Sequence, residues 1–145
     1  MATLGFYGGV GSVTGANFML DTGKTALLVD CGLIQGDQFD QEGNHEPFIY
    51  DPAHIDTLLV THAHADHIGR IPKLMNDGFT GTIYSTTPTR DLANVMLRDA
   101  VKVMRYEAER YGKEVLYEES DVDAALSVWK THDYDQPFGV GDDIT

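Results

Sequence analysis

A short apolar run that leads directly into a dense group of polar side chains constrains this chain more than any other feature. Residues 55–60 read IDTLLV, and the hexapeptide at positions 62–67 reads HAHADH. The first run has the length and composition of a buried strand. Side chains that follow such a strand lie at its carboxyl end, where open α/β sheets bind ligands. Because imidazole and carboxylate groups are good metal donors, the sequence predicts a metal site at one edge of a sheet.

Each residue of the hexapeptide also has a simpler explanation when it is taken alone. A lone histidine such as His62 or His64 is more often an ordinary core or surface residue. Asp66 would fit the N-cap of the helix expected to follow. The complete set arises by chance with odds on the order of 10⁻³ in a chain of this composition. We therefore favour metal binding for these three residues and His67 taken together.

The spacing suggests two ions. His62 and His64 are two positions apart, so on an extended segment they point the same way and can bind one ion. Asp66 and His67 follow a turn of the chain and approach from another direction. Such ligands favour zinc, with manganese or iron as alternatives, and the lack of a thiolate argues against a structural zinc finger. A two-metal site supports hydrolysis of a phosphate, ester or amide.

The wider sequence resembles a known family. Residues 61–74 read THAHADHIGRIPKL and resemble the signature of the metallo-β-lactamase superfamily. The flanks, GGVGSVTGAN at 8–17 and LVDCG at 28–32, are similar to the opening of its β-CASP branch. That branch includes RNase J-type enzymes and the endonuclease of pre-mRNA 3′-end cleavage. The resemblance covers nearly the whole chain and implies an α/β (α+β) fold, the N-terminal half of an αββα sandwich.

The resemblance also implies roles for individual residues. His62 and His64 would hold one zinc ion, and Asp66 and His67 the second, with manganese as an alternative metal. Asp66 would also be the catalytic proton acceptor beside the attacking water. Asp30 would lie behind the metals and support the loop that carries their ligands. Without the resemblance, Asp30 could equally be a plain aspartate at a strand end.

The chain departs from the family pattern after residue 67. Family members carry further histidine and aspartate ligands later, whereas this chain stops at Thr145. His132 is the only later histidine, and its neighbours (THDYD) do not match the family's glycine-flanked motif. We therefore expect residues 1–145 to be the N-terminal part of one domain of a longer enzyme. Alone, this part should bind metal weakly, be inactive, and dimerise, aggregate or be partly disordered through exposed apolar surface.

These features predict a zinc-dependent ribonuclease acting on RNA in the intact protein. The alternatives are another hydrolase of this fold, acting on a thioester, lactone or small phosphodiester, and a non-enzymatic metal-binding module. The net charge of −13 argues against RNA binding by this chain alone. The single Cys31 excludes an internal disulfide and fits a reducing cytoplasm. No signal peptide or membrane-spanning run is present in the sequence, so no membrane partner is expected.

Hydrophobic periodicity and turn signals predict the order of elements. Strands are expected at 3–7, 17–20, 25–30, 57–60 and 82–85, with a hairpin at 21–24 and a loop over 35–52. Helices are expected over 66–75, from Pro88 with Thr87 as its cap, and from Ser120. Apolar residues at 92, 95, 96, 100, 103 and 104 recur at helical spacing and are expected in the core, and Cys31 is expected to be buried. By the resemblance, the glycine-rich turn at 8–15 should approach the metal site.

Overall fold

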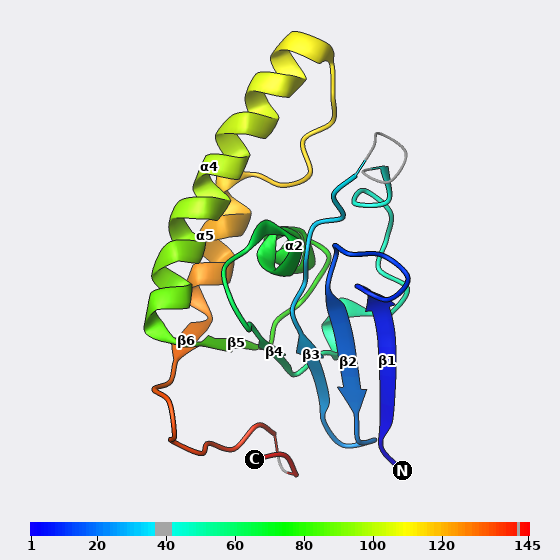
Figure 1. Cartoon of the computed structure of the whole chain (residues 1–145), viewed down its shortest axis with the longest axis vertical. Coiled ribbons are helices and arrows are strands. Elements are labelled where there is room, and N and C mark those ends of the chain that lie inside the picture. Colours follow the sequence, from blue (N-terminus) through cyan, green and yellow to red (C-terminus); the bar gives the residue numbers. More distant parts are fainter. Residues whose placement is uncertain (37–41, 142) are drawn as a thin grey trace.

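The computed structural model describes residues 1–36, 42–141 and 143–145. In these residues one six-stranded mixed sheet has the order β1-β2-β3-β4-β5-β6 (Figure 1). The strands are β1 (Thr3–Gly8), β2 (Asn17–Asp21), β3 (Ala26–Val29), β4 (Thr57–Leu59), β5 (Thr82–Ser85) and β6 (Trp129–Thr131). The helices are η1 (Pro52–His54), α2 (Ala65–Ile68), α3 (Ile71–Asn76), α4 (Thr87–Tyr111) and α5 (Glu119–Ser127).

The sheet changes character along its width. β1, β2 and β3 are antiparallel, and β2 and β3 form the predicted hairpin. From β3 to β6 every pair is parallel, because a helix or loop returns the chain to the same edge each time. Leu28, Leu58 and Ile83 are neighbours across β3, β4 and β5, and all three are 0% exposed. The predicted α/β (α+β) class is confirmed, with helices and a mixed sheet in one layer each.

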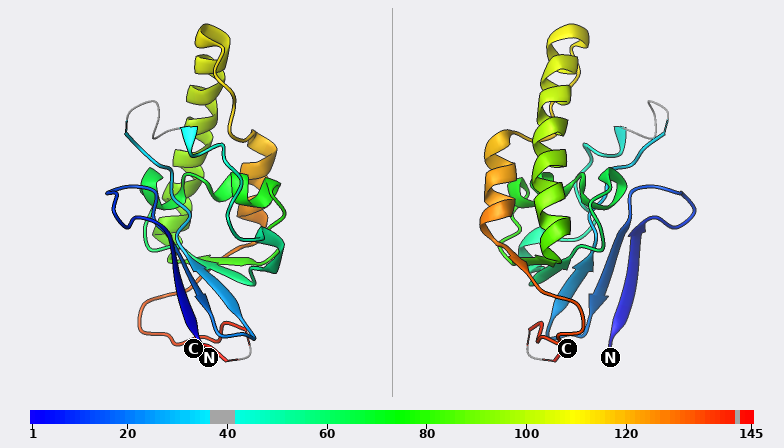
Figure 2. Two further views of the ribbon diagram at one scale, coloured as in Figure 1. Left: turned by 90° about the vertical axis from the view of Figure 1, so that its right-hand side faces the viewer. Right: turned by 60° about the vertical axis from the view of Figure 1, so that its left-hand side comes forward.

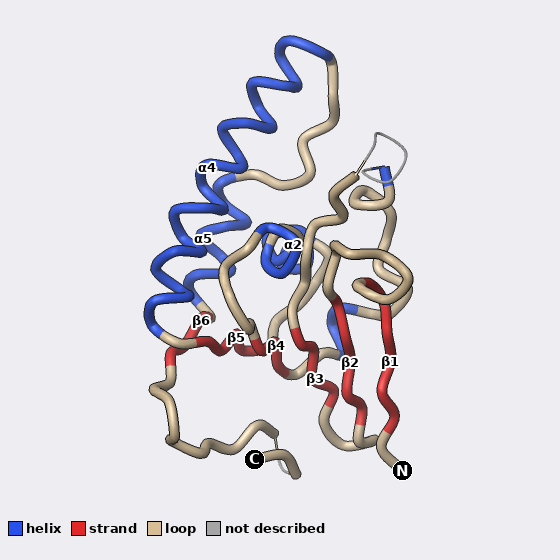
Figure 3. The backbone as a smooth tube through the Cα atoms, in the orientation of Figure 1, coloured by secondary structure: helices blue, strands red, loops and turns tan. Residues whose placement is uncertain are grey.

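The helices gather on one side of the sheet. Figure 2 shows α4 and α5 side by side above the parallel strands, and Figure 3 shows the same separation of helices from strands. The core lies between the two layers, where Leu97 of α4, Val122 of α5 and Leu74 of α3 pack into one cluster with the central strands. Such burial of apolar surface, at about 25 cal/mol per Å², is the main stabilising contribution to the fold.

The helix predicted over 66–75 is wrong as one element, because the chain forms two short helices there. α2 ends at Ile68 and α3 begins at Ile71, with Pro72 in its first turn. Proline lacks the N–H that a continuous helix would need and clashes with the preceding turn. The break separates the segment that carries His67 from α3, which packs mainly against α5.

The predicted core stripe of α4 is wrong for most of its residues, although Met104 is part-buried and packs against the core. Leu92, Val95 and Val103 are 52%, 64% and 51% exposed. The buried face is formed instead by Ala93, Leu97 and Val101, which recur at the same four-residue spacing. α4 has apolar residues on two faces, so periodicity alone could not decide which face packs on the sheet.

The helix starts differ from their predicted positions by one or two residues. Thr86 caps α4, with Thr87 and Pro88 following in its first turn. Glu118 caps α5 through a capping box with Asp121. Cys31 is buried, as predicted. Among the helices in the described part of the chain, none is long and apolar enough to cross a membrane.

Candidate metal centre

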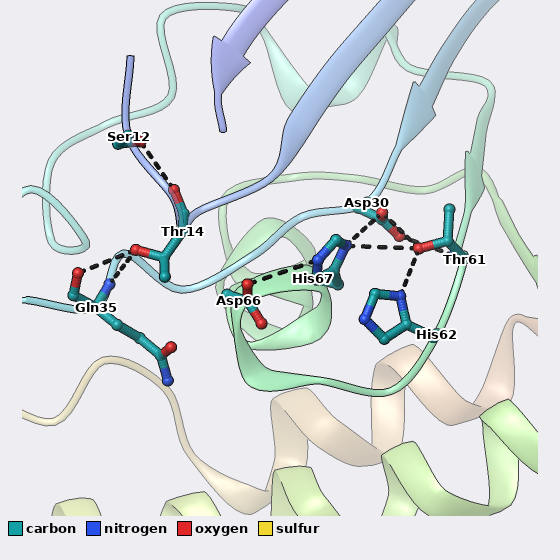
Figure 4. Close-up of polar contacts among 8 residues, drawn as sticks. All are labelled: Ser12, Thr14, Asp30, Gln35, Thr61, His62, Asp66 and His67. Carbon is teal, nitrogen blue, oxygen red and sulfur yellow. Dashed lines mark hydrogen bonds and ion pairs between the residues drawn. The ribbon is translucent and has the colours of Figure 1, made fainter. Parts of the chain in front are cut away.

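His62 and His64 lie on the segment between β4 and α2, whereas Asp66 and His67 lie in α2 itself. Figure 4 shows His62, Asp66 and His67 around this turn. His64 occupies the N-cap position of α2 with an extended backbone, and Asp66 lies in the first turn. The alternative reading of Asp66 as the N-cap is therefore wrong. The turn from strand to helix brings His62, before the turn, close to His67, after it. The two-residue spacing of His62 and His64 gives no information on this contact.

Three imidazole rings converge at this turn. The ring centroids of His62 and His64 are 4.6 Å apart, and those of His62 and His67 are 4.0 Å apart. The carboxylate Oδ2 of Asp66 lies 3.6 Å from Nε2 of His67. Within residues 1–36, 42–141 and 143–145, no group of three or more His, Cys, Asp or Glu side chains is arranged to hold a metal ion. The structure thus brings the predicted donors together as neighbours without closing them into one cage.

Asp30 is the centre of the hydrogen bonds behind these rings. Its Oδ1 accepts a bond from the backbone N–H of Thr61 at 2.8 Å. Its Oδ2 accepts from the Thr61 hydroxyl at 2.7 Å and from Nδ1 of His67, also at 2.7 Å. The Asp30 residue is 2% exposed, so these bonds replace water as the partners of its carboxylate.

This network assigns the tautomers of two histidines. A carboxylate only accepts hydrogen bonds, so His67 must carry its proton on Nδ1. The Thr61 hydroxyl gives its single proton to Asp30, so at its 2.9 Å contact with Nδ1 of His62 it must accept. When the two imidazoles are neutral, each therefore presents a free lone pair on Nε2. A carboxylate behind a histidine is the usual way in which proteins orient a metal ligand.

Close backbone contacts fix α2 against the end of β3. Cys31 donates its N–H to the carbonyl of His67 at 2.8 Å, and Ala16 donates to the carbonyl of Asp66 at 2.9 Å. A Cβ at Gly32 would lie 1.6 Å from the carbonyl oxygen of Asp66, so only glycine fits there.

The glycine-rich turn at 8–15, which the resemblance places near the proposed metal site, is anchored to the loop after β3 and leads into Ala16 beside α2. The turn is held through Thr14, whose hydroxyl donates to the carbonyl of Gln35 at 3.0 Å and accepts from its N–H at 2.9 Å (Figure 4). The contact of Ala16 with Asp66 continues this attachment into α2. The glycine-rich turn is therefore tied to both segments that surround the histidines.

Cys31 lies beside the site without contributing a donor. Burial raises the pKa of its thiol to about 12, since charge on a buried sulfur is poorly solvated. Metals bind the thiolate, so a protonated thiol leaves the donor set to imidazole and carboxylate groups.

Sequence reasoning missed three residues of the site. The hydroxyl of Thr61 joins His62 to Asp30. Gly32 approaches α2 too closely for any side chain. Asn17 donates to the carbonyl of Asp30, and its neighbours in the strand carry no signal of that role.

Comparison with known proteins supports the resemblance. Residues 11–137 match the sequence profile of the metallo-beta-lactamase superfamily. Ribonuclease TTHA0252 of Thermus thermophilus is 37% identical over 135 residues, which cover 93% of this chain and 29% of that protein. Transcription termination factor FttA of Methanosarcina mazei is 34% identical over 142 residues, which cover 94% of this chain and 21% of that protein.

A solved B3 metallo-beta-lactamase with an active-site glutamic acid is 25% identical, with a TM-score of 0.40, and the match covers 55% of this chain and 29% of that one. The chain spans 29% of the length of Ribonuclease TTHA0252 and 21% of the length of factor FttA from Methanosarcina mazei.

Proposed function

Since the chain belongs to the metallo-beta-lactamase superfamily, we propose that it supplies metal ligands to a hydrolase that cleaves RNA phosphodiester bonds. The observation that carries the proposal is the hydrogen-bond network of Asp30 and Thr61, which leaves Nε2 of both His62 and His67 free to bind. The relatives named as a ribonuclease and a transcription termination factor support RNA as the substrate class. They also fit the β-CASP branch that the sequence resembles.

The donor set fits zinc, with manganese as the alternative metal. His62 and His64 would hold one ion, and Asp66 and His67 a second. The facing pair of Asp66 Oδ2 and His67 Nε2 supports the second assignment, because one carboxylate and one imidazole donor lie on the same side of the α2 turn. Bound divalent ions would supply a more acidic water and stabilise negative charge on the phosphate.

The side chains of Asp66, Asp30 and Thr61 would accept a proton and orient the metal ligands. Asp66 would accept a proton from the attacking water, since its carboxylate is part-exposed beside the histidines. Asp30 would keep the proton of His67 on Nδ1 and hold the ring in one orientation. Thr61 would do the same for His62. None of these three roles requires the chain to move.

The charges on α4 favour a second candidate, a hydrolase of a small phosphodiester or ester. α4 carries five of the ten lysine and arginine residues, yet Arg98 pairs with Glu119 at 2.9 Å and with Asp123 at 2.6 Å. Arg105 is paired in the same way with Glu118 at 2.6 Å. Side chains that are already neutralised contribute little to phosphate binding. The phosphates of RNA would then have to bind to groups other than Arg98 and Arg105, whereas a small substrate would need only the metal site.

Calorimetry with zinc tests the assignment of the ligands. The chain should bind zinc, and a His62→Ala/His64→Ala variant should lose at least one of its sites. His54→Ala is the matched control, because the side chain of His54 is 84% exposed and its ion pair is with Asp51. Equal binding by all three proteins would contradict the assignment.

An activity assay distinguishes the candidate functions. Zinc- or manganese-loaded protein, as this chain and as any longer natural protein that contains it, is incubated with labelled single-stranded RNA and with bis(p-nitrophenyl) phosphate. RNA cleavage that falls about 10²–10⁴-fold in Asp66→Asn, and is unchanged in Asp99→Asn on the exposed side of α4, supports the ribonuclease. Cleavage of the small ester alone supports the second candidate. Metal binding with neither reaction would indicate a binding module.

A further inference from the structure

A buried asparagine connects the backbone of Asp30 to a tyrosine from a distant loop. Asn17 lies at the start of β2 and is 1% exposed. Its Nδ2 donates to the carbonyl oxygen of Asp30 at 2.9 Å. Its Oδ1 accepts from the hydroxyl of Tyr50 at 3.0 Å. The asparagine thus joins β2, the end of β3 and the loop before η1.

The orientation of this amide is fixed. The carbonyl of Asp30 only accepts, so the NH₂ group of Asn17 must face it and the amide oxygen must face Tyr50. Burial, which is the largest cause, raises the pKa of Tyr50 far above its ordinary value, so its hydroxyl keeps the proton that it donates. The bond from Tyr50 therefore selects the amide orientation that binds Asp30.

Asp30 needs such support, because its backbone has a left-handed conformation. Its φ is +60°, a value that residues other than glycine rarely adopt. Its N–H is held by the carbonyl of Leu59 at 2.9 Å, and its carbonyl by Asn17. If the backbone relaxed to negative φ, the Cβ of Asp30 would swing and its carboxylate would leave Thr61 and His67.

Tyr50 is itself held by aromatic packing. Its ring stacks on Phe48 with centroids 5.3 Å apart and meets Tyr7 edge-on at 4.9 Å. Phe48 packs against the hydrophobic core and also contacts two cations, with Lys73 at 4.6 Å and Arg70 at 5.2 Å from its ring centroid. The hydroxyl of Tyr50 therefore reaches Asn17 from a packed and immobilised ring.

We propose that Asn17 and Tyr50 are positioning residues, which hold the left-handed backbone of Asp30 and through it the Nδ1-protonated tautomer of His67. The inference rests on the proposed function in that it concerns a proposed metal ligand. Its primary readout, however, needs neither metal nor substrate. Neither residue touches the reacting groups, and both act only through Asp30.

The test is ¹⁵N NMR of the histidine rings in the metal-free chain, which reports the proton position on each nitrogen. Asn17→Ala and Tyr50→Phe are compared with Asn44→Ala. Asn44 is a matched control, because it is also buried and its side chain bonds the backbone N–H and carbonyl of Ile34, away from Asp30. Amide spectra establish that each variant is folded.

We expect the Nδ1–H form of His67 to lose its dominance in Asn17→Ala and Tyr50→Phe and to persist in Asn44→Ala. An unchanged His67 tautomer in a folded Tyr50→Phe protein would overturn the inference, even if Asn17→Ala failed to fold. Zinc titration is the second readout, with affinity expected to fall about tenfold in the two test variants. If the unmodified chain bound no zinc at all, the proposed function would fail, while the tautomer measurement would still decide this inference.

Discussion

Thr61 is bonded twice to Asp30, through its backbone N–H at 2.8 Å and through its hydroxyl at 2.7 Å. This double contact ties the end of β4 to the end of β3 just where the predicted ligands begin. Because the Thr61 hydroxyl also contacts His62, one carboxylate orients groups on both sides of the turn.

Replacing Thr61 by valine should release His62. Valine keeps the shape of threonine but cannot accept a bond from Nδ1, so His62 should populate both tautomers and zinc affinity should fall about tenfold. Thr61→Ser keeps the hydroxyl and should retain the wild-type tautomer. The measurement is ring ¹⁵N NMR together with zinc calorimetry. Identical spectra for the valine and serine variants would show that the hydroxyl does not orient His62.

Asp30→Asn should weaken metal binding more than it weakens the fold. Asparagine tolerates a left-handed backbone, so the turn should survive. The neutral amide is a poorer acceptor for the Nδ1–H of His67, and zinc affinity should fall about 10–100-fold. Asp21→Asn is the control, because the carboxylate of Asp21 accepts a bond from the N–H of Gly23 in its own hairpin turn. Calorimetry measures the zinc affinity of both variants. An equal loss of affinity in the two would argue against a specific role for Asp30.

Gly32→Ala should destabilise the protein by about 3 kcal/mol or more, because its Cβ would overlap the carbonyl oxygen of Asp66. Gly139→Ala should be close to neutral, since nothing lies within 4 Å of a Cβ there. Urea unfolding of both variants measures the difference. A stable Gly32→Ala protein would mean that α2 can move away from the end of β3.

The thiol of Cys31 should be unreactive in the folded protein. With a pKa of about 12 it remains protonated at pH 8, so iodoacetamide should label it only after unfolding. Mass spectrometry with and without urea measures this. Rapid labelling of the folded protein would show that the site opens readily.

The same thiol should make the protein less stable in alkali. The unfolded thiol releases its proton near pH 9, whereas the folded thiol holds it to about pH 12. Between these values the unfolded state binds fewer protons, so the free energy of unfolding falls as pH rises. Cys31→Ala should lose less stability than the wild type between about pH 8 and about pH 11. Urea midpoints at the two pH values provide the measurement, and equal losses would contradict it.

Most strands, and the grouping of His62, His64, Asp66 and His67 at one turn, could be predicted from the sequence. The short parallel strand β4 carries the apolar residues Leu58 and Leu59, and the hairpin between β2 and β3 carries a local turn signal. The helices were harder. Proline is unfavourable inside a helix, but whether Pro72 delays the helix or divides it depends on the packing of α3 against α5. The buried face of α4 depended likewise on which of its two apolar faces meets the sheet.

The sequence by itself determined which donors are present, because His62, His64, Asp66 and His67 lie within six residues and their order restricts their directions. Only the tertiary structure decided how they are oriented. Asp30 is separated from His67 by 37 residues, and their contact exists because β3 and β4 pair in parallel and end at the same edge. The left-handed turn at Asp30 and the contact to Asn17 depend on the same pairing. Local sequence patterns give the residue types and their periodicity. A hydrogen bond between distant segments depends instead on how the whole sheet packs.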